Sequence, residues 1–398
     1  MVRPPTLIIG DLHLGPAAPG GTDAAAVELL ERYRGSELVC LGDLFDLSAE
    51  IGNLSPCESV SARFETFSSL TQALRRHLHG GGSIRIIAGN HDAELGSAGV
   101  AEFLLKYLDA SEPTAVKIAP WWLRHHDLHL EHGHVWDEDN APIHPLAAPR
   151  HEDEPLGVAL TRQVLAPTGA FQFAHAHQTT PLAGLLRVIR DLGVVAPEIV
   201  LRYFAVGATI FWRAVCHDHA QTEREGTYAI AAYARAQGLS RHTVERVLEL
   251  RPTPRHADPA ATFARLYFDR ALAGVLSVTS VAAGAAMNQP GYLLCAAAGA
   301  LYLRYSRGQR AHRYSGSLLK RVESAAHGLR HLVNARTVVF GHTHVPQVRN
   351  GYVNAGAFGF PGQRGRPFLI YDESERLTRG WLGTDLELEP IEPANVPA

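Results

Sequence analysis

Five short blocks of aspartate, asparagine, glycine and histidine constrain the fold of this chain more than any other sequence feature. The first block follows the apolar run Thr6–Gly10, and the last follows Thr337–Phe340. A short apolar run that stops at glycine or at a polar cluster is typical of a buried strand in an α/β sheet. Each block is therefore expected at the end of a strand. The blocks are Asp11-x-His13, Gly42-Asp43-x-x-Asp46, Gly89-Asn90-His91-Asp92, His132-Gly133-His134 and Gly341-His342-x-His344.

The segments between the first three blocks have helical periodicity. The sequence predicts helices over Asp23–Arg34 and Ser61–His79, each lying between two predicted strands. Strands that alternate with helices indicate a layered α/β fold with helices on the faces of a sheet. Such sheets bind ligands at the carboxyl ends of their strands, so the blocks are expected to meet there. Further strands are predicted over 39–41, 84–88, 121–131, 345–353 and 367–371, with another helix over 317–334.

The side chains in these blocks are metal ligands by type. Carboxylate, imidazole and amide oxygen donors suit Mn, Fe or Zn. Residues i and i+2 of an extended segment point to one side, so Asp11 and His13 are expected to aim at a common point, as are His342 and His344. Asp43 has two carboxylate oxygens and is expected to bridge two cations. The glycines are expected to allow sharp turns and to keep bulk out of the site.

In this order, the five blocks resemble the calcineurin-like metallophosphoesterase superfamily, over about residues 6–134 and 335–371. The resemblance implies an α/β fold in the form of a four-layer α/β/β/α sandwich. It also implies a site for two divalent metal ions, with Mn expected and Fe or Zn as alternatives, bridged by Asp43. One ion is then held by Asp11, His13 and His344, and the other by Asn90, His132 and His342.

The resemblance also implies a reaction. Two metal ions held close together clamp the attacking and leaving oxygens at phosphorus and lower the pKa of a bound water. The implied enzyme hydrolyses a phosphodiester, a phosphomonoester or a pyrophosphate by attack of metal-bound hydroxide, without a covalent enzyme intermediate. His91 would contact the phosphate and stabilise or protonate the leaving oxygen, and Asp46 would orient His91. His134, two residues after His132, is a candidate substrate contact.

Within this superfamily, the stretch Gly42–Asp46 and the apolar insertion resemble the enzymes that cleave UDP-2,3-diacylglucosamine, a lipid A precursor. Those enzymes typically carry arginine at the position of His91 and aspartate at the position of His134. The resemblance therefore carries over the reaction, and a lipid-linked substrate is a hypothesis. The alternatives are a soluble nucleotide phosphodiesterase or nuclease and, in another class, a non-catalytic membrane-associated scaffold with this fold.

The chain divides into four parts. Residues 1–134 and 317–384 are predicted to form the phosphoesterase core, 135–316 a mostly helical insertion or cap, and 385–398 a loose tail. The most apolar stretch is Ala271–Leu303, interrupted by the turn signal Asn288-Gln289-Pro290-Gly291. Arginines flank it on both sides, which favours a hairpin that enters a membrane and returns to the cytoplasmic side. A hairpin buried in the cap and an oligomer interface are the alternatives.

Composition places the chain among folded proteins with a hydrophobic core, since 46% of its 398 residues are hydrophobic and 19% are charged. The net charge of -3 gives no basic field, so nucleic acid is not an expected partner. The four cysteines form no close pair, and the N-terminus lacks a secretory pattern. These features predict a cytoplasmic protein, peripheral on the cytoplasmic face of the membrane, that acts on a lipid or nucleotide phosphoester.

Other histidines lie outside the metal-ligand positions. His125, His126 and His129 are expected to face solvent on their strands, as lone histidines beside a complete site usually do. His175 and His177 share the i, i+2 spacing without a carboxylate nearby in the sequence, and a metal site there is a hypothesis.

Overall fold

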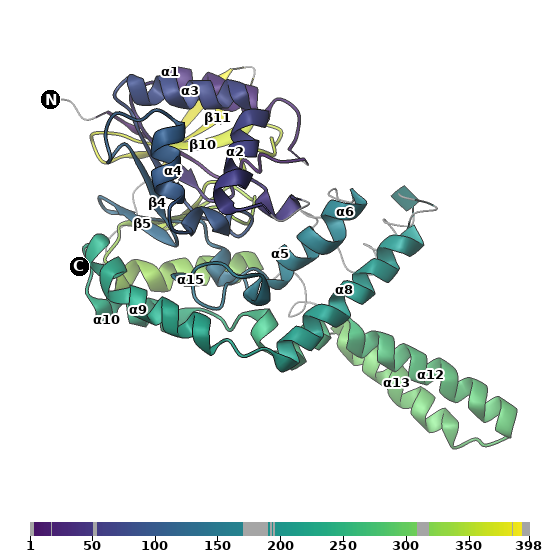
Figure 1. Ribbon diagram of the computed structural model, residues 1–398. Helices are drawn as coiled ribbons and strands as arrows, with labels where there is room; N and C mark the ends of the chain where they lie inside the picture. Colours follow the sequence, from purple (N-terminus) through teal and green to yellow (C-terminus); the bar gives the residue numbers. More distant parts are fainter. Residues whose placement is uncertain are drawn as a thin grey trace.

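The structure is a computed structural model that describes residues 4–16, 18–50, 54–169, 190–191, 193, 196–308, 318–383 and 385–391. Two mixed sheets stack face to face with helices on both outer faces, which confirms the four-layer α/β/β/α sandwich (Figure 1). The first sheet has the order β12 (Leu386–Pro390), β11 (Leu377–Leu382), β10 (Arg366–Tyr371), β1 (Thr6–Ile9), β2 (Glu37–Leu41), β3 (Ser83–Ile87) and β4 (Val116–Ala119). The second has the order β5 (Trp122–His125), β6 (Leu128–Glu131), β7 (Thr337–Phe340), β9 (Tyr352–Asn354) and β8 (Gln347–Arg349).

Parallel pairing aligns the carboxyl ends of the strands that precede the blocks. β1, β2, β3 and β4 run parallel in the first sheet, and β6, β7 and β9 run parallel in the second. Alternate side chains of each strand face opposite sides. Ile8 and Val39 therefore pack between the sheets with Leu130, while Leu7 and Leu38 face the outer helices.

Helices α1 (Thr22–Arg32), α2 (Pro56–Thr66), α3 (Ser68–His79) and α4 (Val100–Tyr107) cover the first sheet. The single helix predicted over Ser61–His79 is two helices, because Phe67 leaves helical geometry with φ −102° and ψ 51°. α2 begins before the predicted start, since the side chains of Ser55 and Glu58 form a capping box and Pro56 occupies the first turn. Capping chemistry, rather than apolar periodicity, sets this boundary.

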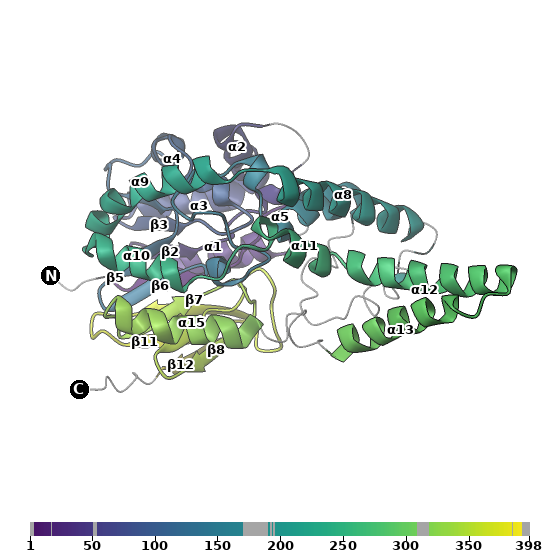
Figure 2. The same cartoon turned by 90° about the horizontal axis from the view of Figure 1, so that it is seen from below.

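Helices α9 (Ala220–Ala236), α10 (Arg241–Leu250) and α15 (Leu318–Leu332) cover the second sheet (Figure 2). Their buried side chains form one apolar cluster with Trp121, Trp122 and Phe340. α9 and α10 come from the segment expected to form the cap. Part of that segment is therefore a layer of the core, because its amphipathic helices bury one face against the sheet.

The remaining helices after residue 196 lie to one side of the sheets. α8 (Ala196–Cys216) leads to α9, and α11 (Pro259–Arg265) leads to the antiparallel pair α12 (Phe268–Met287) and α13 (Tyr292–Gly308). This pair projects away from the sheets in both views, which confirms the predicted helical hairpin (Figures 1 and 2). Among the described residues, Ala273 and Ser306 are the buried residues of the hairpin, which does not support the alternative of a hairpin buried in the cap. By length and composition, α8 and α12 are able to cross a membrane.

The expected loose tail is partly ordered, because β12 pairs antiparallel with β11. The alternating Leu-Glu-Leu-Glu pattern of this strand was hidden by the Pro-rich and Glu-rich composition around it. His175 and His177 lie outside the described residues. The short helices are η1 (Leu47–Ala49), η2 (Ala93–Gly96), η3 (His134–Trp136), η4 (His151–Asp153), α5 (Leu156–Leu160), the π-helix η5 (Thr161–Leu165), α6 (Ala166–Thr168) and η8 (Arg255–Ala257).

Candidate metal centre

The five blocks meet in one buried site, as the strand pattern predicted. The blocks of Asp11, Asp43 and Asn90 follow β1, β2 and β3 of the first sheet. The blocks of His132 and His342 follow β6 and β7 of the second sheet. All five of these side chains are buried. The fold thus brings polar residues from distant parts of the chain to the same edge of both sheets.

Left-handed backbone, not extended backbone, directs these side chains. Non-glycine residues rarely adopt positive φ, and such residues cluster at functional sites. The i, i+2 argument for an extended segment is therefore wrong, although Asp11 and His13 do converge because the chain turns sharply between them. The side chains of His342 and His344 face different neighbours instead of one point. Positive φ is found at Asp11 (54°), His13 (47°), Asp43 (48°), His342 (62°) and His344 (58°).

Asp11, His13 and His344 form a first group of donors. His13 Nε2 lies 3.1 Å from His344 Nε2 and 3.9 Å from Asp11 Oδ1. His344 Nε2 lies 3.2 Å from the same Asp11 oxygen. Bonds of about 2 Å to a shared ion place its ligand atoms roughly 3 Å apart, so these three atoms are spaced to bind one ion. Phe360 stacks on the His344 ring at a centroid distance of 5.3 Å.

Asn90 and His132 form a second group. His132 Nε2 lies 3.2 Å from Asn90 Oδ1, while His132 Nδ1 lies 2.9 Å from the Leu41 carbonyl oxygen. Because the Leu41 carbonyl oxygen accepts the Nδ1–H of His132, the proton of the neutral ring is on Nδ1, and Nε2 is the atom able to bind an ion. Asn90 Nδ2 donates to Asn140 Oδ1 at 3.3 Å, which turns the Asn90 oxygen toward His132. Both side chains therefore present a donor atom to the same space.

Asp43 lies between the two groups. Its Oδ2 lies 3.5 Å from His13 Nε2 and 3.1 Å from His132 Nε2. Its Oδ1 accepts the backbone N–H of His91 at 2.9 Å. A single oxygen therefore faces both groups, because the main chain of the next loop holds the other. The position fits the predicted bridge, and bridging itself remains a prediction.

The electrostatics of the site fit a divalent cation. Burial would raise the pKa of Asp43, but the charges of His132 and His91 lower it well below its usual range. Burial would lower the pKa of His132, but the charges of Asp43 and Asp11 raise it to about 10. These buried carboxylates therefore create a strongly negative potential. Divalent ions satisfy such a donor set, and the Asp, Asn and His atoms present suit Mn, Fe or Zn.

His342 is held by Asp137, which is held in turn by Asn140, and the sequence analysis missed both residues. His342 Nε2 lies 3.0 Å from Asp137 Oδ2, and its ring centroid lies 5.2 Å from that of His132. Asn140 Nδ2 donates to the same Asp137 oxygen at 2.7 Å. Burial would raise the pKa of Asp137, but the contact with His342 lowers it well below its usual range. The available signal was the polar run 137–140, which begins three residues after the fourth block.

His91 lies against Asp46, as predicted. His91 Nδ1 lies 3.1 Å from Asp46 Oδ1 and 2.7 Å from Ser48 Oγ, and Ser48 Oγ donates to Asp46 Oδ1 at 2.8 Å. Ser48 was not predicted. Burial would lower the pKa of His91, but the charges of Asp43 and Asp46 raise it to about 9. The carboxylates of Asp43 and Asp46 therefore favour the protonated form of the His91 imidazole, and its catalytic role remains a prediction.

Asp92, in the block after β3, also holds the loop that contains the block after β2. Asp92 Oδ2 accepts the N–H of Leu44 at 2.7 Å, and Asp92 Oδ1 accepts the N–H of Gly89 at 2.7 Å. A Cβ atom at Gly89 would lie 2.1 Å from Asp43 Oδ1. Gly89 therefore keeps bulk away from the central carboxylate, as expected, and Asp92 ties the two loops together.

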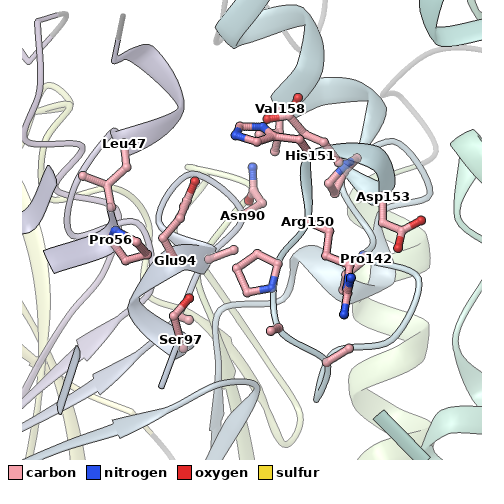
Figure 3. Close-up of a pocket in the computed structure, with 18 of the residues that line it drawn as sticks. Leu47, Pro56, Asn90, Glu94, Ser97, Pro142, Arg150, His151, Asp153 and Val158 are labelled. Carbon is pink, nitrogen blue, oxygen red and sulfur yellow. The ribbon is translucent and has the colours of Figure 1, made fainter. Parts of the chain in front are cut away.

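A cavity of about 600 Å³ lies beside Asn90. The segments after β2 and β3 form one wall, and the segment 134–162 forms the other (Figure 3). His134 also lines the cavity, with its ring centroid 5.3 Å from that of His132. Burial, together with the charges of His132 and His342, holds the pKa of His134 well below its usual value. A neutral His134 thus stands at the wall, and its contact with substrate remains a prediction.

Two histidines outside the site differ from expectation. The side chain of His125 is only 11% exposed, and its Nε2 lies 2.9 Å from Thr6 Oγ1. His129 does not face solvent, since it is 1% exposed and its Nε2 lies 3.0 Å from Glu131 Oε2. Glu131 also accepts the indole N–H groups of Trp121 and Trp136, each at 2.9 Å. A buried carboxylate needs such donors, so His129 is drawn inward to complete the set. His126 is exposed, as expected.

The family comparison agrees with this geometry. The family described as Calcineurin-like phosphoesterase matches residues 4–202, a segment that includes the first four blocks. No curated protein matches the chain. The buried clusters Asp11–His13–His344 and Asp11–Asp43–His132 are consistent with a dinuclear metal site of this family. The chain belongs to the calcineurin-like phosphoesterase family.

Proposed function

We propose that this protein is a dinuclear metal-dependent phosphoesterase that hydrolyses a phosphodiester, a phosphomonoester or a pyrophosphate in a lipid-linked substrate. The observation that carries the proposal is the position of Asp43 Oδ2, 3.5 Å from His13 Nε2 and 3.1 Å from His132 Nε2. A carboxylate oxygen between two groups of donors is suited to be shared by two ions. Mn²⁺ is the expected metal, with Fe or Zn as alternatives.

The bound ions and the surrounding side chains have different roles in the proposed reaction. Two bound ions supply an activated water and positive charge at phosphorus. Asp46 and Ser48 hold Nδ1 of His91, which leaves Nε2 as the donor to a phosphate oxygen or to the leaving group. Neutral His134, at the cavity wall, contacts a polar group of the substrate.

The cavity favours a small or lipid-linked phosphoester over a nucleic acid. Both arginines in its lining are already paired, Arg150 with Glu225 at 2.5 Å and Arg162 with Glu94 at 2.9 Å. Nucleic-acid binding draws its affinity from basic side chains that neutralise phosphates. An acyl group instead binds to an apolar surface. The apolar residues that line this cavity are Leu47, Leu54, Pro56, Pro142, Ile143 and Val158.

The exposed apolar helices support a position at a lipid bilayer. Val278 of α12 is 69% exposed, Leu294 of α13 is 75% exposed, and Trp212 of α8 is 67% exposed. Soluble monomers rarely expose continuous apolar surface of this extent. Arg304 and Arg307, near the end of α13, are exposed where they would meet anionic headgroups. We therefore propose the cytoplasmic face of the bilayer as the partner of this surface.

The reaction is tested by metal analysis and turnover of the Asp43→Ala variant. The protein with Mn²⁺ is expected to hydrolyse nitrophenyl phosphate or bis-nitrophenyl phosphate. Asp43→Ala is expected to lose at least one ion and all measurable turnover. Asp109→Ala is the matched control, because Asp109 has the same left-handed backbone (φ 54°) in an exposed position. Normal activity in Asp43→Ala contradicts the proposal, and a wild type without metal or hydrolysis favours the scaffold alternative.

A substrate panel tests the lipid assignment separately. UDP-2,3-diacylglucosamine and other lipid-linked phosphoesters in micelles are compared with cyclic nucleotides and DNA, all with Mn²⁺. The largest kcat/KM is expected for a lipid-linked substrate. A preference for DNA or cyclic nucleotides overturns the substrate and supports the nuclease or nucleotide phosphodiesterase alternative, while the reaction class stands.

Vesicle binding tests the apolar surface. The full chain is expected to sediment with vesicles of phosphatidylglycerol and phosphatidylcholine, and the double variant Leu276→Glu/Val278→Glu is expected to remain in solution. Leu388→Glu is the matched control, because Leu388 is an exposed apolar residue of β12. If the wild type ignores vesicles and the double variant converts a dimer to a monomer, the surface is an interface between copies and the membrane proposal fails.

A further inference from the structure

A second cluster of metal-ligand side chains lies in the helical segment, outside the five blocks. His217 and His219 stand in the corner between α8 and α9, and Asp153 is the last residue of η4. His217 Nε2 lies 3.1 Å from Asp153 Oδ1, and His219 Nδ1 lies 2.5 Å from the same oxygen. The ring centroids of the two histidines are 5.0 Å apart. Two imidazoles thus converge on one carboxylate oxygen.

Hydrogen bonds among these residues leave polar atoms unsatisfied. His219 Nε2 is buried and has no partner in the described part of the chain. His256 of η8 is 4% exposed, and its ring centroid lies 5.8 Å from that of His219. Neither ring nitrogen of His256 makes a well-formed hydrogen bond, although the Asp153 main chain is near. Buried polar atoms without partners are costly and call for an explanation. An ion on Nδ1 of His219 would leave its Nε2 unchanged, so His256 is the buried side chain that points to an ion here.

We propose that Asp153, His217 and His219 bind a Zn²⁺ ion, with His256 beside the fourth coordination position. Imidazole and carboxylate donors suit Zn²⁺ in tetrahedral sites. Zinc bonds of about 2.0–2.2 Å place the ligand atoms roughly 3.3 Å apart and the ring centroids of two imidazoles roughly 5 Å apart. The 3.1 Å contact between His217 Nε2 and Asp153 Oδ1 and the 5.0 Å spacing of the ring centroids are close to these values, whereas the 2.5 Å contact of His219 Nδ1 with Asp153 would lengthen when an ion enters.

The neighbours of the cluster suit a structural ion. Thr222 of α9 donates its hydroxyl to Asp153 Oδ2, which orients Oδ1 toward the two histidines. Asp153 belongs to the lining of the cavity, and Figure 3 shows its carboxylate pointing away from Asn90, so the ion would lie at the wall and not beside the donor atom of Asn90. The ligands come from η4 and the α8–α9 corner, and His256 of η8 lies beside them. Zn²⁺ would therefore fix the base of the exposed helix α8 to the helix α9 that covers the second sheet.

Two substitutions of one residue separate metal binding from hydrogen bonding. His217 is suitable because its side chain is 31% exposed, so its replacement is not expected to disturb the core. Gln at this position keeps a hydrogen-bond donor but is a poor zinc ligand. Glu is a zinc ligand, yet without an ion its charge would be repelled by Asp153. If the cluster binds zinc, the Glu variant should keep the ion and the Gln variant should lose it. If hydrogen bonds alone hold the cluster, the Gln variant should resemble wild type more closely than the Glu variant.

The full chain is equilibrated with Zn²⁺, freed of unbound ions and analysed for metal and melting temperature. Wild type and His217→Glu are expected to hold one Zn²⁺ more per chain than His217→Gln, and Zn²⁺ raises the melting temperature of only the first two. His151→Gln, an exposed neighbour of the cluster, is the matched control and should behave as wild type. Co²⁺ in place of Zn²⁺ should give the visible spectrum of a tetrahedral site. Equal zinc content in wild type and His217→Gln overturns the proposal, whatever the Mn²⁺-dependent turnover shows.

Discussion

Asp137 and His342 are joined by a 3.0 Å contact between Oδ2 and Nε2, which fixes one predicted ligand of the second ion. Asn140 donates to the same carboxylate and accepts from Asn90, so the contact continues to a second predicted ligand. Asp137→Ala removes the common partner of this chain of hydrogen bonds. We predict that it weakens metal binding by about 10–100-fold, the usual effect of losing a residue that orients ligands.

The measurement is turnover as a function of Mn²⁺ concentration. If Asp137 orients His342, saturating Mn²⁺ should restore most of the activity of Asp137→Ala, whereas it should not restore Asp43→Ala. An Asp137→Ala variant with the metal dependence of wild type would show that the contact has no part in ion binding.

Gly89→Ala is predicted to inactivate the protein although Gly89 contributes no side chain. The added Cβ would lie 2.1 Å from Asp43 Oδ1, so the central carboxylate must move. Displacement of a reacting group by about 1 Å costs on the order of 100-fold in rate. Gly96→Ala is the matched control, because its added Cβ would meet Pro120 at an ordinary 3.4 Å. Activity assays of the two variants at equal metal occupancy check the prediction, and similar rates would refute it.

The strand ends were predictable because the sequence itself marks them. Val39–Leu41 and Thr337–Phe340 are short apolar runs that stop at glycine, and the structure has strands ending at Leu41 and Phe340. The meeting of the blocks then follows from parallel pairing, which the alternation of strands and helices also signals. The backbone conformation within each block, by contrast, could not be predicted from the sequence pattern. Only the structure shows that Asp11 and His13 converge through left-handed backbone rather than along an extended strand.

The missed residues share one physical cause, which is that their partners are distant in sequence. Asp137 follows β6 and meets His342, which follows the neighbouring strand β7, and Ser48 meets His91 from a different loop. No local pattern specifies such a pair, because periodicity and capping rules describe neighbours along the chain. His129 is a different case, because Glu131 is only two residues away and the burial of the pair depends on how the indoles of Trp121 and Trp136 gather around that carboxylate.

His91 is predicted to act on the reaction without holding metal. Its contacts are with Asp46 and Ser48 on one side and with the ring of His13, at 5.0 Å, on the other. His91→Ala should lower kcat by about 10²–10⁴-fold, the range for loss of a general acid, while the metal content stays at the wild-type level. Ser48→Ala should lower kcat less, because Asp46 still holds Nδ1. Metal analysis beside steady-state kinetics checks both, and loss of metal from His91→Ala would contradict this role.

His144 is predicted to weaken the fold as the pH falls. It is 3% exposed, its Nδ1 accepts the N–H of Leu146 at 3.2 Å, and its Nε2 has no partner among the described residues. Burial, with the nearby charge of Arg251, lowers its pKa from 6.5 to about 4. A folded-state pKa below the unfolded value means that stability is complete above about pH 6.5 and is lost as the pH falls toward 4.

Between pH 7.5 and pH 5 this histidine should account for a loss of about 2 kcal/mol in the free energy of unfolding, because the unfolded chain takes up the proton more readily. His144→Asn provides the comparison, since Asn keeps an acceptor for the Leu146 N–H but does not titrate. Urea unfolding gives the free energy of unfolding of both proteins at the two pH values. Because every other titratable group is present in both proteins, the difference between their losses of stability reports on His144. The variant should lose less stability than wild type over this interval. Parallel losses would mean that the His144 ring takes up its proton in the folded state without hindrance, and that its burial has no energetic consequence.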